Sequence, residues 1–260
     1  MAGANDEILF SVADGIGTLT LNRPEARNAL TFAMYERLAE ICAAPEAHGA
    51  RVLILTGAGE KAFAAGTDIS QFRAFSTPQD AIGYEQRIER IVTTIETCPV
   101  PTIAAISGAV TGGGAAIACS CDLRIAAANA KFGFPIARTL GNCLSMKNYA
   151  RLAGLLGAAR VKDLIFTARL MEAEEGRAIG LYSELLADHA ALMARAEALA
   201  RTIAGHAPLT LSVTKRALAR IADGTQGHDD DLILACYMSE DFREGMEAFL
   251  AKRPPQWKGR

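Results

Sequence analysis

Two glycine-containing stretches follow apolar runs and could stabilise a developing negative charge. Residues 108–116 read Gly-Ala-Val-Thr-Gly-Gly-Gly-Ala-Ala and follow the apolar run 102–106. A strand that enters three glycines and then small helix-forming residues leaves backbone N–H groups free at a helix N-terminus. Residues 63–68, Phe-Ala-Ala-Gly-Thr-Asp, close the expected strand 52–56 in the same manner. Because an N–H group from each stretch could bracket one carbonyl oxygen, the sequence predicts an oxyanion site.

The composition favours one globular body. With 260 residues, half of them hydrophobic, the chain can bury one large core and carry a small helical appendage. The net charge is −2, and single Lys and Arg residues are scattered among acids, which disfavours nucleic-acid binding. Residues 1–7 lack a signal-peptide pattern, and no window approaches the roughly 20 apolar residues of a membrane span. We therefore expect a cytoplasmic protein that does not bind membranes.

The cysteines and histidines do not suggest a metal centre. Cys42, Cys119 and Cys236 lie inside apolar runs, which is typical of reduced core thiols. Cys119 and Cys121 lack a second Cys or His pair, and the four histidines are far apart. We expect no metal site.

The N-terminal half alternates strand and helix patterns. Residues 8–12 and 16–21 alternate around Asp14-Gly15, the pattern of a β-hairpin. Thr31 precedes a helical pattern that extends to Cys42, and Thr77-Pro78 begins a longer one that ends near residue 97. The expected elements between and after these helices are a strand at 52–56, a strand, glycine loop and helix over 102–120, a strand at 122–126 and an extended segment at 131–135.

Beyond Ser145 the period is helical almost throughout. The expected helices are 146–156, 158–167, 172–179, 190–204, 209–222, 229–238 and 241–251. The fold class is therefore α/β, with a C-terminal helical region that packs on the body or on another subunit.

Four blocks in order resemble one family. They are 22–30 (NRPEARNAL), 55–68 (LTGAG and FAAGTD), 108–126 (glycine loop and CDLRIA) and 240–249 (EDFREGMEAF). The chain is similar to the enoyl-CoA hydratase/isomerase (crotonase) superfamily. The resemblance implies a crotonase-like spiral of ββα units over residues 1–195 and a C-terminal helical trimerisation region over 196–260. It also implies a homotrimer or dimer of trimers, an acyl-CoA thioester substrate and no cofactor, because coenzyme A is part of the substrate.

The resemblance also assigns site residues. The backbone N–H groups of Thr67 and Gly113 would form the catalytic oxyanion hole, the Thr67 side chain being incidental. The residues that would bind substrate or coenzyme A are Ala26, Ala64, Gly66, Asp68, Ile69 and Gly112. For Asp68 a structural cap is the favoured interpretation, since its carboxylate can accept from loop N–H groups.

Two departures from the family pattern concern proton transfer. The hydratases of this family carry one glutamate three residues after the oxyanion glycine and another after the proline of a Phe-Gly-x-Pro segment. Ala116 and Ile136 occupy these positions here, and we expect both to line the pocket. Neither side chain can transfer a proton, so ordinary hydration is disfavoured.

No replacement base stands out. Asn142 and Ser145 are polar candidates near the second lost glutamate, although for each of them a local structural role is the favoured interpretation. Glu85 and Glu89 are interpreted as a solvated helix face. Two functions remain open. One is a lyase- or isomerase-type enzyme that stabilises a thioester enolate, and the other is a catalytically silent acyl-CoA-binding paralogue.

Overall fold

The chain folds as a spiral of strand–strand–helix units. The structure is a computed structural model that describes residues 7–225, 227 and 229–260. Successive units are β1 (Ile8–Ala13), β2 (Ile16–Leu21) and α1 (Phe32–Ala43); β3 (Val52–Gly57), β4 (Ala62–Ala64) and α2 (Pro78–Glu96); β5 (Thr102–Ile106), β6 (Ala109–Thr111) and α3 (Gly113–Ser120); β7 (Leu123–Ala127), β8 (Lys131–Gly133) and α4 (Met146–Leu156). This is the α/β architecture that the sequence pattern predicted, with the crotonase-like spiral that the family resemblance implied.

The second, third and fourth units each contribute one strand to each of two sheets, whereas both strands of the first unit belong to the larger sheet. The larger sheet has the order β1-β2-β3-β5-β7-β10, with β10 at Glu184–Leu186, and it is parallel except for the β1–β2 hairpin. The smaller sheet has the order β4-β6-β8-β9, with β9 at Met171–Glu172. All of β3 and β5 is buried, as expected for parallel strands that are covered on both faces.

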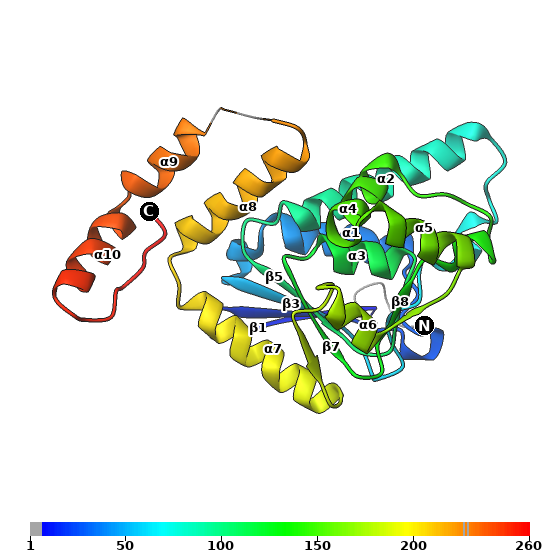
Figure 1. The fold of residues 1–260 in the computed structure, drawn as a ribbon, viewed down its shortest axis with the longest axis horizontal. Coiled ribbons are helices and arrows are strands. Elements are labelled where there is room, and N and C mark those ends of the chain that lie inside the picture. Colours follow the sequence, from blue (N-terminus) through cyan, green and yellow to red (C-terminus); the bar gives the residue numbers. More distant parts are fainter. Residues whose placement is uncertain (1–6, 226, 228) are drawn as a thin grey trace.

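Helices cover both faces of the larger sheet (Figure 1). The helices α1, α2 and α3 lie on one face, and α7 (His189–Ala204) lies on the other. Leu192, Ala196, Ala200 and Ile203 of α7 pack with Ile54 and other residues of the strands. The boundary expected at 195/196 therefore falls inside a helix whose contact with the sheet continues to its last turn.

The local signals in the sequence correspond to observed caps. The hydroxyl of Thr31 accepts from Met34 N at 3.2 Å, and that of Thr77 accepts from Asp80 N at 3.3 Å. Each threonine begins its helix at the expected place. The expected helix 172–179 is shorter in the structure, because Glu172 belongs to β9 and α6 covers Ala173–Ala178.

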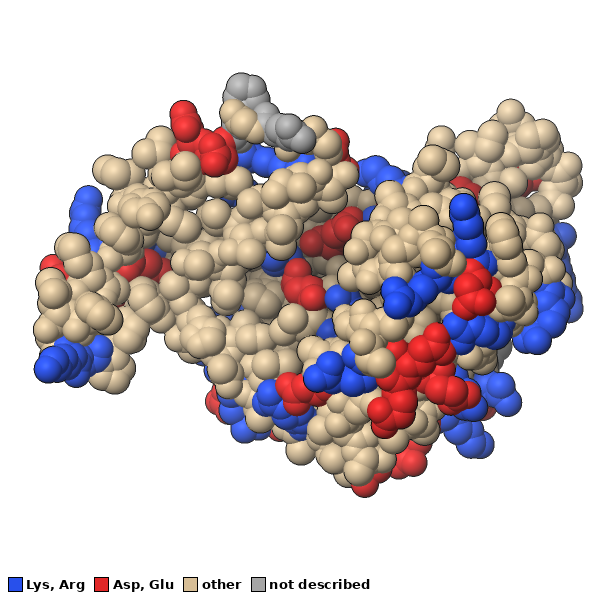
Figure 2. Space-filling view, in the orientation of Figure 1, with Lys and Arg blue, Asp and Glu red and all other residues tan. Residues whose placement is uncertain are grey.

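Of the last three helices, α8 (Pro208–Ala222) lies beside the body, and α9 (Asp230–Tyr237) and α10 (Glu240–Leu250) extend away from it (Figure 1). The earlier helix α5 (Ala158–Thr167) packs beside α4. Phe249 and Leu250 of α10 are 83% and 75% exposed. Figure 2 shows charges of both signs interspersed over the body, while much of the visible surface of α8 to α10 is uncharged.

Two further sequence expectations concern cysteines and membranes. Cys42 and Cys119 are buried free thiols, as expected, whereas Cys236 is only half-buried. No helix within the described residues is both long enough and apolar enough to span a bilayer.

Candidate active site

Three parallel strands of the smaller sheet end at one edge, and the predicted site residues follow them. β4 pairs in parallel with β6, and β6 pairs in parallel with β8. Thr67, Gly113 and Ile136 come shortly after the carboxyl ends of β4, β6 and β8, respectively. The register of this sheet therefore brings together three segments that lie far apart in the sequence.

Two glycines shape the turns that leave these strands. Gly66 has φ of 100°, and Gly112 has φ of 50° and ψ of −120°, conformations that L-residues with a side chain rarely adopt. A Cβ atom on Gly112 would lie 3.5 Å from Gly66 Cα, so the two turns face each other closely. The N–H of Gly112 donates to Gly133 O at 3.2 Å and ties its turn to β8.

The N–H groups of Thr67 and Gly113 are available to a ligand. No acceptor among the described residues takes a hydrogen bond from either of them. Gly113 is the first residue of α3, where an N–H has no partner within the helix. The Thr67 peptide is held on both sides, since Leu30 N donates to Gly66 O at 2.8 Å and Asp68 N donates to Leu30 O at 2.9 Å.

The side chain of Thr67 is anchored rather than incidental. Its hydroxyl oxygen lies 2.9 Å from the Tyr35 hydroxyl and 3.0 Å from the Tyr84 hydroxyl. Burial raises the pKa of both tyrosines, so these hydroxyls remain neutral hydrogen-bonding groups. A Cβ atom on Gly113 would collide with the Tyr35 hydroxyl, so a larger residue there would force Tyr35 to move.

The loops after β4 and β6 line a cavity of about 200 Å³. The predicted site residues that line it are Gly66, Thr67, Ile69, Gly112, Gly113, Ala116, Ile136 and Asn142. Ala116 and Ile136 are only 5% and 7% exposed, and both present apolar side chains to the cavity. The structure thus places position 116 on the same side of α3 as Gly113, as the helical spacing indicated.

Four predicted residues do not line this cavity: Ala26, Ala64, Asp68 and Ser145. Ala26 ends the short helix η1 (Pro24–Ala26), and Ala64 lies within β4, where its carbonyl faces the Cα atom of Gly114. Asp68 caps η3 (Ile69–Phe72): its carboxylate accepts from Ser70 N at 3.0 Å and pairs with Arg23 Nη1 at 3.0 Å. Its hydrogen bonds with Ser70, and then Arg23, lower its pKa.

Ser145 is occupied by structural contacts. Its hydroxyl caps α4 by accepting from Asn148 N at 3.2 Å and donates to Glu89 Oε2 at 2.6 Å. Glu89 also accepts from Thr93 Oγ1 at 3.0 Å and pairs with Arg151 Nη2 at 3.2 Å. Both Ser145 and Glu89 therefore join α2 to α4 rather than facing the cavity.

Glu85 is the cavity residue whose position the sequence analysis missed. It lines the cavity, is half-buried, and accepts no hydrogen bond from any described residue. Burial, with the nearby negative charge of Glu89, raises the pKa of its carboxyl group. The sequence signal for its position was helical spacing. Glu85 lies three positions before Ile88 and seven before Val92, both buried, which places it at the edge of the apolar face of α2.

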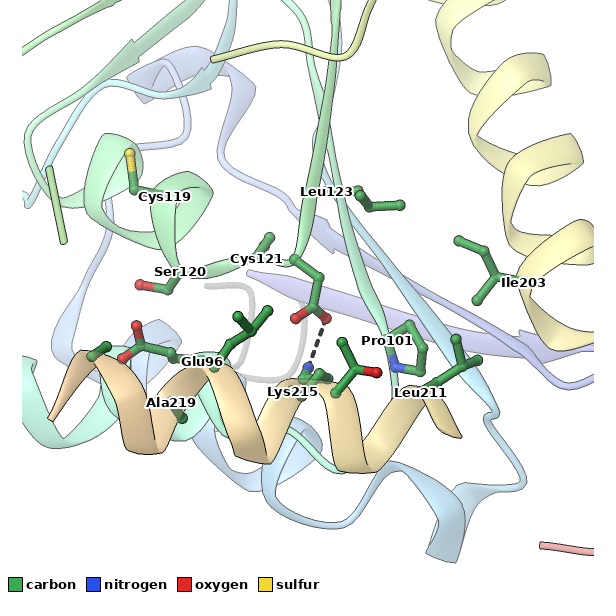
Figure 3. A pocket seen from close by; sticks show the side chains of 14 residues that line it. Glu96, Pro101, Cys119, Ser120, Cys121, Leu123, Ile203, Leu211, Lys215 and Ala219 are labelled. Carbon is green, nitrogen blue, oxygen red and sulfur yellow. Dashed lines mark hydrogen bonds and ion pairs between the residues drawn. The ribbon is translucent and has the colours of Figure 1, made fainter. Parts of the chain in front are cut away.

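A larger cavity of about 470 Å³ lies between α8 and the body (Figure 3). Its polar side chains are already paired: Lys215 Nζ donates to Asp122 Oδ2 at 2.6 Å and to Val100 O at 3.0 Å, and Glu96 pairs with Arg151. Within the described part of the chain, no group of three or more His, Cys, Asp or Glu residues could hold a metal ion. The glycine-lined cavity is therefore the stronger candidate.

The spiral of ββα units, with N–H groups after β4 and β6 that donate to no described residue, defines a crotonase-like protein. Sequence comparison identifies the family. The family model for enoyl-CoA hydratase/isomerase matches residues 11–260. The chain belongs to the enoyl-CoA hydratase/isomerase family.

Individual relatives match over nearly their whole length. A short-chain-enoyl-CoA hydratase of Clostridium acetobutylicum is 35% identical over 256 residues, covering 95% of this chain and 96% of the relative. A crotonyl-CoA hydratase of Syntrophomonas wolfei is 32% identical, with 96% and 97% covered. The crystal structure of an enoyl-CoA hydratase/carnithine racemase from Magnetospirillum magneticum superposes with a TM-score of 0.90 at 35% identity, covering 98% of this chain and 96% of that one.

Proposed function

We propose that the protein acts on an acyl-CoA thioester whose carbonyl oxygen lies between the N–H groups of Thr67 and Gly113. The support is that both donors are free and line one cavity. Fixed donors of this kind stabilise the negative charge that develops on oxygen as a thioester becomes an enolate. The names of the relatives, which include hydratases of enoyl-CoA and crotonyl-CoA, support the substrate class. Coenzyme A enters as part of the substrate, and the proposed chemistry requires no cofactor.

The proposed reaction is enolate chemistry other than hydration. Ala116 and Ile136 are the observation that carries this conclusion, because they present methyl and alkyl groups where a base for water and an acid for the α-carbon would be needed. Thioester hydrolysis would use the same two donors for a tetrahedral oxyanion instead of an enolate, whereas isomerisation, decarboxylation and carbon–carbon cleavage pass through the enolate. The latter three place the enzyme among lyase- or isomerase-type members of its family.

The test compares two activities of the same protein. Hydration of crotonyl-CoA is followed by loss of the enone absorbance, and incorporation of deuterium at C2 or C4 of 3-hexenoyl-CoA in D₂O is followed by mass spectrometry. We expect ready deuterium incorporation and slow hydration. Efficient hydration would contradict the assignment of reaction class. Tight binding with neither activity, and no turnover of an acyl-CoA panel, would instead identify a silent binding protein.

A further inference from the structure

We propose that Glu85, on α2, is the catalytic acid–base of this site and transfers the substrate proton. Ala116 and Ile136, which occupy the positions of the two glutamates of the hydratases, lie on other elements. The inference rests on the proposed binding of a thioester at Thr67 and Gly113. Glu85 would supply the proton-transferring group that the proposed enolate chemistry needs and that Ala116 and Ile136 cannot provide.

Elimination among the cavity residues favours Glu85. The titratable groups that line the cavity in the described part of the chain are Glu85, Tyr84 and Cys143. The Tyr84 hydroxyl is engaged with Thr67 at 3.0 Å, and burial raises its pKa, so it is a poor base. Cys143 is exposed in the loop before α4. The remaining polar side chains there, Thr111, Thr139, Asn142 and Asn148, do not titrate near neutral pH.

The contrast with Glu89 shows why Glu85 is suited to proton transfer. Glu89 lies one turn further along α2 and is fixed by Ser145 at 2.6 Å and Arg151 at 3.2 Å. Glu85 has no such partner among the described residues and is half-buried at the cavity wall. A partly desolvated carboxyl group without a cation has a pKa closer to neutrality, which suits it to both accept and return a proton.

The neighbours of Glu85 fix its position relative to the oxyanion donors. Tyr84, the preceding residue, bonds to the Thr67 hydroxyl at 3.0 Å, so this turn of α2 is tied to the residue that supplies one donor N–H. Ile88, three residues later, is buried and lines the same cavity. The backbone of α2 at Glu85 is therefore held between a polar and an apolar anchor.

The proposed step balances without any other reactant. The Glu85 carboxylate removes a proton from C2 of a 3-enoyl thioester, and the C–H electron pair moves into the thioester to give an enolate oxygen on the Thr67 and Gly113 N–H groups. The Glu85 carboxyl proton can exchange with solvent at this stage, and the enolate electrons then take a proton, or in D₂O a deuteron, from Glu85 at C4, leaving a C2=C3 double bond and restoring the carboxylate. The net result is a 1,3-shift of one proton and one double bond.

The experiment uses the full chain with 3-hexenoyl-CoA in D₂O. In Glu85→Gln, deuterium incorporation and formation of the 2-enoyl product should both fall about 10² to 10⁴-fold, the usual contribution of a general acid–base. The dissociation constant for the unreactive hexanoyl-CoA should change little. Glu40→Gln is the matched control, since Glu40 is an exposed glutamate of α1 whose one ion pair among the described residues is with Arg37 at 2.8 Å, and it should retain wild-type rates.

A pH profile separates catalysis from a structural role. The charged and titratable groups around Glu85 are Glu89 with its partner Arg151, the Tyr84 and Tyr35 hydroxyls, and Cys143. The wild-type rate should rise with pH as Glu85 loses its proton, above the range of an ordinary glutamate. Glu89→Gln should move that inflection to lower pH, because it removes the negative charge that raises the pKa of Glu85. Glu85→Asp should retain a rising profile.

Each outcome bears on the proposal. Wild-type exchange rates in Glu85→Gln, or an inflection that Glu89→Gln leaves unmoved, would overturn the role of Glu85. Wild-type protein that binds hexanoyl-CoA but exchanges no proton of 3-hexenoyl-CoA with D₂O would also overturn the role of Glu85. The proposed thioester site would then still stand. Protein that binds no acyl-CoA would overturn the proposed function itself.

Discussion

The hydroxyl oxygen of Thr67 lies 2.9 Å from that of Tyr35, a fully buried residue of α1. This contact ties the loop after β4 to the first helix of the spiral and places the Tyr35 hydroxyl against Gly113. The two residues that would donate to the thioester oxygen are thus positioned against one side chain. Their spacing depends on α1 as much as on the two glycine turns.

Removing the Thr67 hydroxyl should cost more stability than removing that of Tyr35. Thr67→Val keeps the backbone N–H but leaves the buried Tyr35 hydroxyl unpaired, at a cost of about 1–3 kcal/mol. In Tyr35→Phe the Thr67 hydroxyl still bonds to Tyr84, so the loss should be nearer 0.5–1.5 kcal/mol, roughly one net hydrogen bond. Urea unfolding of both variants measures the difference. A Thr67→Val protein as stable as wild type would show that the contact has no structural role.

Restoring carboxyl groups at the two apolar positions should restore hydration. The double variant Ala116→Glu with Ile136→Glu adds a base and an acid to the cavity wall, and each such group contributes about 10² to 10⁴-fold. We expect a clear rise in crotonyl-CoA hydration over wild type. The double glutamine variant is the matched control and should remain slow. Equal rates in the two double variants would contradict the explanation based on proton transfer.

Glu85→Gln should be more stable than wild type, and increasingly so as pH rises. Burial and Glu89 raise the folded-state pKa of Glu85 above its ordinary value of 4.5, so the folded protein binds this proton more tightly than the unfolded chain does. The stability that results is complete below about pH 4.5 and is lost as pH rises through the raised pKa. Glutamine does not titrate and avoids that loss.

Urea unfolding at pH 4 and at pH 8 measures this effect. The stability difference between Glu85→Gln and wild type should be larger at pH 8, whereas Glu40→Gln should show no such trend. A difference that shrinks with pH would mean that the carboxylate is stabilised by a favourable contact in the folded protein.

The C-terminal helices should mediate self-association, with a trimer or a dimer of trimers as the expected state. Phe249 and Leu250 are largely exposed on α10, which extends away from the body (Figure 1). Light scattering at micromolar concentration should give a mass above that of the monomer. Glutamate at both positions should lower this mass, whereas Leu9→Glu, an exposed leucine of β1, should not. A monomeric wild-type protein would contradict the prediction.

The features that the sequence predicted correctly are those with local causes. The hairpin around Asp14-Gly15 and the capped helices after Thr31 and Thr77 depend on residues within a few positions of each other. The available N–H of Gly113 follows similarly from a strand, three glycines and a helix. The family resemblance supplied the spiral, which composition and periodicity alone do not specify.

The features that were missed depend on long-range packing. The strands β9 and β10 contain only 2 and 3 residues, and they are defined by pairing with β8 and β7 rather than by their own composition. Glu85 faces the cavity because α2 packs against α1 and α3, which a helical period alone does not reveal. The bonds of Thr67 to Tyr35 and Tyr84 span 32 and 17 positions in the chain, so the local sequence contained no sign of them.

The carbonyl stretch of bound hexanoyl-CoA, labelled with ¹³C at the thioester carbon, tests the central claim most directly. Two fixed N–H donors withdraw electrons from the carbonyl bond, so its frequency in the complex should lie below that of the same thioester in water. Gly113→Ala, whose Cβ atom would collide with the Tyr35 hydroxyl, should return the frequency toward the solution value. A wild-type complex with a frequency at or above the solution value would contradict binding of the thioester oxygen by Thr67 and Gly113.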